Sequence, residues 1–317
     1  MKIVVLDSAP LDRGDLDWAS IREFGELVAY ESTASEQIEE RIDEADIVLT
    51  NKVPLSEVNL NLARNLKLVS VLATGYDVVD INAAGRRGIA VANVPGYSAA
   101  FTAQTTIALL LELANRVGDH AQSVKNGEWV RSSTFSYWKT PLVELSGKTI
   151  LVVGLGEIGR RVAAIAAALG MRVVAAQFPG REPGESPFPR VPVDEGFAIA
   201  DVITLHSPLT AQTLELVNAR RLALVDPGAL IVNTARGALV NEGDVASALA
   251  TGHLAGYGAD VLSKEPPVPT NPLLTARNAI ITPHYGWASP DARQRMLAET
   301  TANIAAFIAG TPRNVVN

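Results

Sequence analysis

The glycine-rich segment Gly154–Gly159 (GLGEIG) is the feature that most constrains the fold of this chain. It directly follows the apolar run Thr149–Val153 and precedes an alanine-rich stretch with helical character. In this strand–turn–helix context the GxGxxG pattern is typical of a dinucleotide-binding unit, whereas an ordinary glycine turn is the alternative. We expect Gly154 to permit the tight turn, Gly156 to let the backbone approach a pyrophosphate, and Gly159 to let the helix pack on the strand. The helix N-terminus then favours the phosphates.

Short apolar runs alternate with helix-compatible stretches along the whole chain, which is the pattern of parallel sheets. One series lies at residues 3–6, 47–49, 68–72 and 89–92, and a second at 149–153, 172–176, 202–205, 230–233, 256–261 and 280–282. A chain of 317 residues exceeds the usual limit of a single core. We therefore predict an α/β fold with two domains, the second of them a doubly wound nucleotide domain.

Three further segments contribute to the predicted architecture. A long helix from Ser98 to about Val117 could bridge the domains, and a final helix from about Pro290 to Ala309 has Gly310 as its C-cap. The segment from Gln177 to Pro192 holds five prolines, so we expect a loop there. That loop follows the second strand of the nucleotide domain, where the cofactor's ribose would lie.

Composition excludes several classes of function. The chain carries 27 Lys and Arg against 34 Asp and Glu, a net charge of −7, so we expect no nucleic-acid partner. It has no cysteine, and its four histidines form no zinc-protease pair, so we expect neither disulfides nor a metal. No apolar stretch reaches the about 20 residues of a membrane span, and the first strand is too short for a signal peptide. We expect a cytoplasmic protein without membrane contact.

The residue at the end of the second strand of the nucleotide domain bears on the choice of cofactor. An acidic residue there usually binds the ribose hydroxyls of NAD, but this chain has Gln177. A glutamine does not repel a 2′-phosphate, and Arg181 follows nearby as a phosphate partner, which favours NADP. The alternative is that Gln177 binds the ribose of NAD and that Arg181 is a solvated loop residue. The cofactor is accordingly predicted as NAD or NADP.

Three polar residues stand at or just after apolar strands, in the segments NTARGALV, ADVLSKEPP and ITPHYGWAS. Arg236 offers a planar fork for a carboxylate. His284 can exchange a proton near neutrality, and Glu265 would favour its protonated form. Each residue alone has a simpler explanation, as an ion pair, a turn residue or a strand-end polar residue. Together they fit the reduction of a 2-keto acid, with Arg236, Glu265 and His284 as the catalytic set.

These segments together make the chain similar to the D-isomer-specific 2-hydroxyacid dehydrogenase family over almost its whole length. Further similar pieces are ATGYDVVD, GIAVANVPGYS, ADVITLHSPLT and the closing NVVN. TNKVPL, FSYWKTPLVELSGKT and HYGWAS resemble the hydroxypyruvate and glyoxylate reductases, also called glycerate dehydrogenases. The resemblance implies two Rossmann-like doubly wound parallel-sheet domains. Residues 1–98 and 287–317 would form the substrate-binding domain and residues 99–286 the dinucleotide-binding domain.

The resemblance also implies further site residues and a homodimer. Implied cofactor contacts are Thr102, Glu157, Ile158, His206, Pro208, Thr213, Thr234, Ala235 and Asp260. Implied substrate contacts are Lys52, the backbone of Thr74 and Gly75, and Trp138, which would reach the pocket across a dimer interface or simply pack in it. The expected activity is hydride transfer between NAD(P)H and a small 2-keto acid such as hydroxypyruvate or glyoxylate, giving the D-2-hydroxy acid.

Two other functions compete with this one. A regulatory protein on the same fold could sense nicotinamide dinucleotide without turnover, but the complete set of Arg236, Glu265 and His284 argues against it. A phosphoglycerate-type dehydrogenase would be expected to carry a regulatory extension beyond Asn317.

Overall fold

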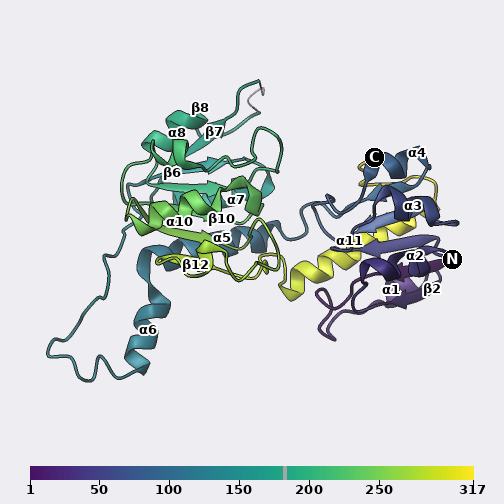
Figure 1. Cartoon of the computed structure of the whole chain (residues 1–317), viewed down its shortest axis with the longest axis horizontal. Helices are drawn as coiled ribbons and strands as arrows, with labels where there is room; N and C mark the ends of the chain where they lie inside the picture. The colour runs from purple at the N-terminus through teal and green to yellow at the C-terminus, as the bar shows by residue number, and fades with distance from the viewer. Residues whose placement is uncertain (181–183) are drawn as a thin grey trace. The chain divides into compact units, whose positions relative to one another are not determined.

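The computed structural model describes residues 1–180 and 184–317, which divide into two compact units (Figure 1). One unit combines Met1–Ser98 with Trp287–Asn317, and the other is Ala99–Gly286. The chain thus leaves the first unit once and returns to it.

The described residues of the first unit form a five-stranded parallel sheet in the order β2-β1-β3-β4-β5. Its strands are β1 (Lys2–Val5), β2 (Glu26–Ala29), β3 (Ile47–Thr50), β4 (Leu68–Val71) and β5 (Ala90–Ala92). Its helices are α1 (Ala19–Arg22), α2 (Ile38–Ile42), α3 (Glu57–Leu62), α4 (Ile81–Arg86) and α11 (Pro290–Ile308), with a 3-10 turn, η1, at Ser35–Gln37. Strands β3 and β4 are buried along their whole length, as strands covered on both faces must be.

The C-terminal segment completes this unit. Helix α11 begins where the Ser289 hydroxyl accepts the N–H of Ala292, and it packs Met296 and Ile304 into the core beside β1. The tail then runs along β5, where the N–H of Val316 donates to the carbonyl of Val91 at 2.9 Å.

The described residues of the second unit form a seven-stranded parallel sheet in the order β12-β11-β10-β9-β6-β7-β8. Its strands are β6 (Thr149–Val153), β7 (Arg172–Gln177), β8 (Arg190–Pro192), β9 (Val202–Leu205), β10 (Ala229–Asn233), β11 (Leu254–Ala259) and β12 (Ala279–Ile281). Its helices are α5 (Ala99–Asn115), α6 (Val117–Lys125), α7 (Glu157–Ala168), α8 (Val193–Ile199), α9 (Ala219–Leu222) and α10 (Glu242–Ala250), with 3-10 turns η2 (Gly237–Leu239) and η3 (Pro272–Leu274). Because the strand order reverses between β6 and β9, the crevice for a ligand lies at their carboxyl ends.

The doubly wound parallel fold predicted from the sequence is confirmed, but several details were wrong. Edge strand β2 was not predicted. The segment predicted as loop up to Pro192 ends in strand β8, which pairs with β7 and tolerates a proline because it is an edge strand. The helix expected to bridge the domains, α5, lies inside the second unit, where it packs on α7, β10 and β11.

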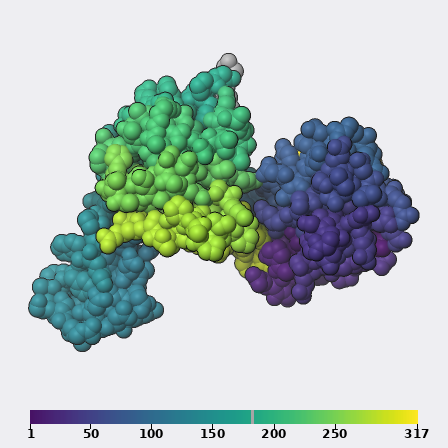
Figure 2. All heavy atoms as spheres, viewed as in Figure 1, coloured from purple at the N-terminus to yellow at the C-terminus, as the bar shows by residue number. Residues whose placement is uncertain are grey.

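Helix α6 and the loop after it extend away from the sheet of the second unit (Figure 1) and form a separate lobe in the space-filling view (Figure 2). This arm, residues 117–142, exposes large apolar side chains that include Val130, Phe135 and Trp138. No helix in the described part of the chain is both long and apolar enough to cross a membrane.

Candidate functional site

The glycine-rich turn has the geometry that the sequence predicted. Gly154 has a φ of +101°, a conformation that side chains disfavour, and a Cβ at that position would lie 2.7 Å from the backbone of His206. A Cβ on Gly159 would lie 1.9 Å from the carbonyl oxygen of Gly154, so helix α7 packs directly on the turn. A Cβ on Gly156 would meet no atom of the described residues within 4 Å, its chain neighbours aside. The backbone at Gly156 is therefore open to a ligand at the N-terminus of α7.

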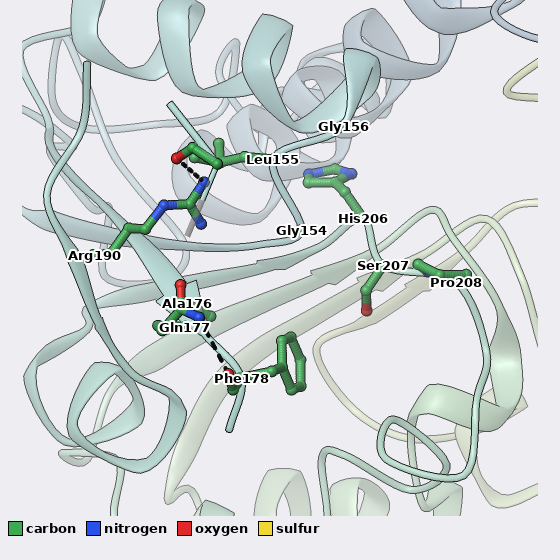
Figure 3. A pocket seen from close by; sticks show the side chains of 11 residues that line it. Gly154, Leu155, Gly156, Ala176, Gln177, Phe178, Arg190, His206, Ser207 and Pro208 are labelled. Atoms are coloured by element: carbon green, nitrogen blue, oxygen red, sulfur yellow. Dashed lines mark hydrogen bonds between the residues drawn. The ribbon is translucent and has the colours of Figure 1, made fainter. Parts of the chain in front are cut away.

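A cavity of about 250 Å³ lies against this turn (Figure 3). It is lined by Gly154, Leu155, Gly156, Ala176, Gln177, Phe178, Gly184, Arg190, His206, Ser207 and Pro208. These residues come from the carboxyl ends of β6, β7 and β9, from β8 and from the loop before β8. The cavity thus lies at the position where the sheet topology predicts a nucleotide.

Gln177 lines the cavity at the end of β7, as the sequence predicted for the residue near the ribose. Its side-chain amide donates to the carbonyl of Phe178 at 3.2 Å. Arg181, the predicted phosphate partner, lies outside the described residues.

His206 and Ser207 form the wall of the cavity on the β9 side. His206 Nε2 lies 2.7 Å from the hydroxyl of Thr204, and burial lowers the pKa of His206 to about 3. The imidazole is therefore neutral near pH 7. Ser207 is only 3% exposed, and within the described parts of the chain its Oγ has no hydrogen-bond partner.

The other predicted cofactor residues lie on the same unit, in the loops and helix ends around the sheet. Glu157 and Ile158 form the first turn of α7, where Glu157 pairs with Arg161 at 3.2 Å. Pro208 lines the cavity, whereas Thr213 is fully buried and its hydroxyl donates to the Pro208 carbonyl at 2.7 Å. Thr213 therefore shapes the loop.

Two threonines of α5 connect this helix to neighbouring loops. The hydroxyl of Thr102 donates to the carbonyl of Gly286 at 2.9 Å. The hydroxyls of Thr106 and Thr234 form a hydrogen bond of 2.8 Å, and Thr234 lies directly after β10. Ala235 follows Thr234 and is half-buried. Helix α5 thus fixes two of the loops in which predicted site residues lie.

Arg236 stands in the turn after β10, which the buried side chain of Asn233 holds in shape. The Asn233 amide donates to the carbonyl of Arg236 at 2.9 Å, and its oxygen accepts the N–H of Ala235 at 3.0 Å. Arg236 is half-buried, and its Nη1 donates to the carbonyl of Ala235 at 2.8 Å. The fully buried Asn233 was not predicted, although its place before Thr234 in the segment NTARG was a usable signal.

Gly237 brings the Arg236 turn against the loop that carries Glu265. A Cβ on Gly237 would lie 1.9 Å from the carbonyl carbon of Leu262. In that second loop, Glu265 Oε1 accepts the N–H of Leu262 at 3.0 Å. The two loops are therefore in backbone contact, and only a residue without a side chain fits at position 237.

Glu265 and His284 form the central contact of the site. Nδ1 of His284 lies 2.6 Å from Oε2 of Glu265, and the two side chains are 26% and 34% exposed. A carboxylate oxygen accepts hydrogen bonds, so Nδ1 of His284 is the donor in this contact. The structure thus brings together two of the three predicted catalytic side chains through a direct hydrogen bond.

The buried carboxylate of Asp260 anchors the loop of His284. Its Oδ1 accepts the Thr282 hydroxyl at 2.5 Å and the N–H of Tyr285 at 3.1 Å, and its Oδ2 accepts the N–H of Gly286 at 2.7 Å. His284 itself adopts a left-handed backbone with φ +53°, which is strained for a histidine. Asp260 offsets this strain by satisfying donors on both sides of the histidine.

Lys52, Thr74 and Gly75 lie in the first unit, in loops after β3 and β4. Asp7, which is buried, accepts the backbone N–H of Asn51 at 2.8 Å and of Lys52 at 2.6 Å. Thr74 donates its hydroxyl to the carbonyl of Val94 at 2.9 Å. In the part of the chain that the structure describes, the backbone N–H groups of Thr74 and Gly75 donate to no protein acceptor. Trp138 belongs to the arm of the second unit and is 69% exposed.

The cavity residues that sequence reasoning missed are spread over β6, β7, β8 and β9 and the segments that adjoin them. They are Leu155, Ala176, Phe178, Gly184, Arg190 and Ser207. Arg190 was missed because its segment was predicted as loop, and the short apolar-polar pattern of β8 was the only signal. Ser207 stands next to His206 in the segment ADVITLHSPLT.

Residues 107–286 match the family model of the D-isomer specific 2-hydroxyacid dehydrogenase, NAD binding domain. A hydroxypyruvate reductase of Blautia hydrogenotrophica is 44% identical, with all of both chains covered. The chain belongs to the D-isomer-specific 2-hydroxyacid dehydrogenase family. The resemblance inferred from the sequence motifs is thereby confirmed.

Two further known proteins are similar to this chain over almost its whole length. A glycerate dehydrogenase of Methylorubrum extorquens is 39% identical over 96% of this chain and 97% of the relative. A solved structure of an acyclic imino acid reductase in complex with NADPH and D-Arg superposes with a TM-score of 0.90, at 28% identity and with all of both chains covered. Family membership makes this dehydrogenase an oxidoreductase that uses a nicotinamide dinucleotide and a small 2-keto or 2-hydroxy acid.

Proposed function

We propose that this dehydrogenase reduces a small 2-keto acid such as hydroxypyruvate or glyoxylate to the D-2-hydroxy acid. The observation that carries the proposal is the His284 to Glu265 hydrogen bond of 2.6 Å, on a loop anchored by Asp260 in the dinucleotide-binding unit. The relatives named hydroxypyruvate reductase and glycerate dehydrogenase support this substrate class.

The residues around the cavity fit a nicotinamide dinucleotide. The open backbone at Gly156 and the free N–H groups of the first turn of α7 suit a pyrophosphate. Among the described residues, the buried Oγ of Ser207 has no hydrogen-bond partner, so it suits a polar group of the ligand. When bound, the nicotinamide ring supplies the hydride that is added to the keto carbon.

Arg236, Glu265 and His284 divide the remaining chemistry. Arg236 binds the substrate carboxylate through two parallel hydrogen bonds, which orients the keto group. Nε2 of His284 gives its proton to the keto oxygen as the oxygen becomes an alkoxide, and it takes the proton back in the reverse direction. Glu265 holds the ring in position through Nδ1. On the first unit, the backbone N–H groups of Thr74 and Gly75, with Lys52, are the contacts that we propose for a small anion.

The proposal also assigns the remaining cofactor contacts and the oligomeric state. Thr102, Thr234, Ala235 and Asp260 contact the nicotinamide half of the cofactor, and Gln177 contacts its adenosine ribose. The exposed apolar arm, which includes Trp138, forms the interface of a homodimer, since large exposed apolar patches mark interaction surfaces.

A panel assay with hydroxypyruvate, glyoxylate, pyruvate and phenylpyruvate, each with NADH and NADPH, tests the function. The variant His284→Asn tests the mechanism, because asparagine tolerates the left-handed backbone of this position. We expect its kcat to fall by about 10²- to 10⁴-fold with cofactor affinity retained. Near-normal turnover of His284→Asn would refute the assignment. Cofactor binding without oxidation by any keto acid would instead indicate a sensor.

A further inference from the structure

Arg190 is a half-buried cation that lines the cavity, and no part of the proposed chemistry uses it. It begins edge strand β8, which pairs with β7 through Ala175, and its side chain enters the same cavity as Gln177 (Figure 3). Its Nη2 donates to the carbonyl of Gly184 at 3.1 Å. Its Nε is buried and, among the described residues, has no hydrogen-bond partner. A buried N–H without a partner is costly, so this one points to an acceptor on a ligand.

Ser207 provides a second, independent observation at the same place. Its side chain is 97% buried, and its Oγ lines the cavity without a partner in the described parts of the chain. Two buried donors on opposite walls, from β8 and from the end of β9, therefore face one cavity. An apolar or absent ligand would leave both unsatisfied.

The charge of the cavity wall selects among dinucleotides. The lining residues within the described chain include no aspartate or glutamate, and Gln177 occupies the end of β7, where a carboxylate would bind the ribose hydroxyls. A carboxylate there would repel a phosphate, whereas a guanidinium binds one through charge-assisted hydrogen bonds. The neutral Gln177 beside the cation Arg190 is thus the arrangement that suits a phosphorylated ribose.

We propose that Arg190 binds the 2′-phosphate of the adenosine ribose and makes NADP(H) the preferred cofactor of this dehydrogenase. The inference rests on the proposed function, since it assumes that the cavity holds the adenosine end of a nicotinamide dinucleotide. It assigns the phosphate contact to a residue of strand β8, whereas the sequence pointed to Arg181. Arg190 is a binding residue that determines specificity, and it takes no part in proton transfer.

Binding measured without any keto acid tests this proposal separately from turnover. NADPH and NADH, which differ only in the 2′-phosphate, are titrated into the purified full chain, and the nucleotide fluorescence gives each Kd. We expect the wild type to bind NADPH at least about 10-fold more tightly than NADH. Arg190→Met should weaken NADPH binding by about 10- to 100-fold, the range of a charge-assisted hydrogen bond, and change NADH binding by less than about 3-fold.

Two further variants separate recognition of the phosphate from folding. Arg190→Lys keeps the positive charge and should restore part of the preference for NADPH, which a loss of structure would not allow. Arg172→Met removes an exposed arginine at the opposite end of β7 and should leave both Kd values unchanged. Thermal unfolding of each variant confirms that it is folded.

Different failures point to different errors. Equal Kd values of the wild type for NADPH and NADH, or equal weakening of both by Arg190→Met, would overturn the role of Arg190 and leave the proposed function standing. Binding of neither nucleotide by the folded wild type would overturn the proposed function as well.

Discussion

Replacing Gly237 by alanine should damage catalysis from a position that carries no functional group. The new Cβ would lie 1.9 Å from the carbonyl carbon of Leu262, whereas real Cβ contacts are not found under 3.0 Å. The Arg236 turn and the Glu265 loop must therefore move apart by about 1.1 Å. Both neighbours at the contact are backbone atoms, so a side-chain rotation cannot relieve the clash.

A displacement of this size is large for a catalytic site. A misplacement of about 1 Å can reduce a rate by about 10²-fold, so we expect kcat of Gly237→Ala with hydroxypyruvate to fall by about that factor. Overpacking in addition costs about 1–3 kcal/mol of unfolding free energy. The cavity at the glycine-rich turn is lined by other loops, whereas Thr234 and Ala235 of the displaced turn are proposed nicotinamide contacts, so the Kd for the dinucleotide, measured by nucleotide fluorescence, should rise by a smaller factor than kcat falls.

Gly243→Ala is the matched control. This glycine lies in helix α10 of the same unit, and a Cβ there would be 3.5 Å from the Asn241 side chain, an ordinary contact. Alanine in a helix should keep or slightly raise stability. If Gly237→Ala shows the same kcat and Tm as Gly243→Ala, the close contact does not position the catalytic loops.

Three further predictions follow from other contacts. Because the pKa of His206 is about 3 when folded and about 6.5 when unfolded, the unfolded chain binds an extra proton between these pH values, and stability falls as pH drops through that window. Between pH 7 and pH 5, the unfolding free energy of His206→Asn, measured by denaturant titration, should therefore fall by about 2 kcal/mol less than that of the wild type. An equal fall in both proteins would contradict the burial of His206. Asp260→Asn removes an acceptor from buried donors and should lower both kcat and the unfolding free energy, the latter by about 1–3 kcal/mol. Thr282→Val removes only one of the donors and should lower the unfolding free energy by less. Equal effects of the two variants would argue against Asp260 as the anchor. Phe135→Asp on the arm should disrupt the proposed homodimer and reduce the mass measured by light scattering to the 33.6 kDa of the monomer. Val58→Asp, at another exposed apolar residue, should leave the mass unchanged. An unchanged mass for Phe135→Asp would place any interface elsewhere.

The sequence by itself determined the fold class and predicted a catalytic set, because both depend on local patterns. Alternating apolar runs predict parallel strands, and the GxGxxG spacing around Gly154 predicts the turn whatever the distant contacts are. Arg236, Glu265 and His284 were predicted as a set because each follows a strand, and parallel strands end at the same edge of a sheet. Boundaries were less accurate, since β11 begins at Leu254 rather than at Gly256.

Only the tertiary structure decided how these residues act on one another. The contact of Gly237 with Leu262 and the three hydrogen bonds to Asp260 join segments that are more than 20 residues apart, and no local pattern encodes such pairs. Arg190 shows the same limit, because its strand is short, lies at an edge and follows a proline-rich segment, so propensity favoured a loop there. Pairing with β7 makes it a strand and carries its guanidinium into the cavity. The physical reason is that burial and partners, which give a polar group its role, arise only when distant segments pack together.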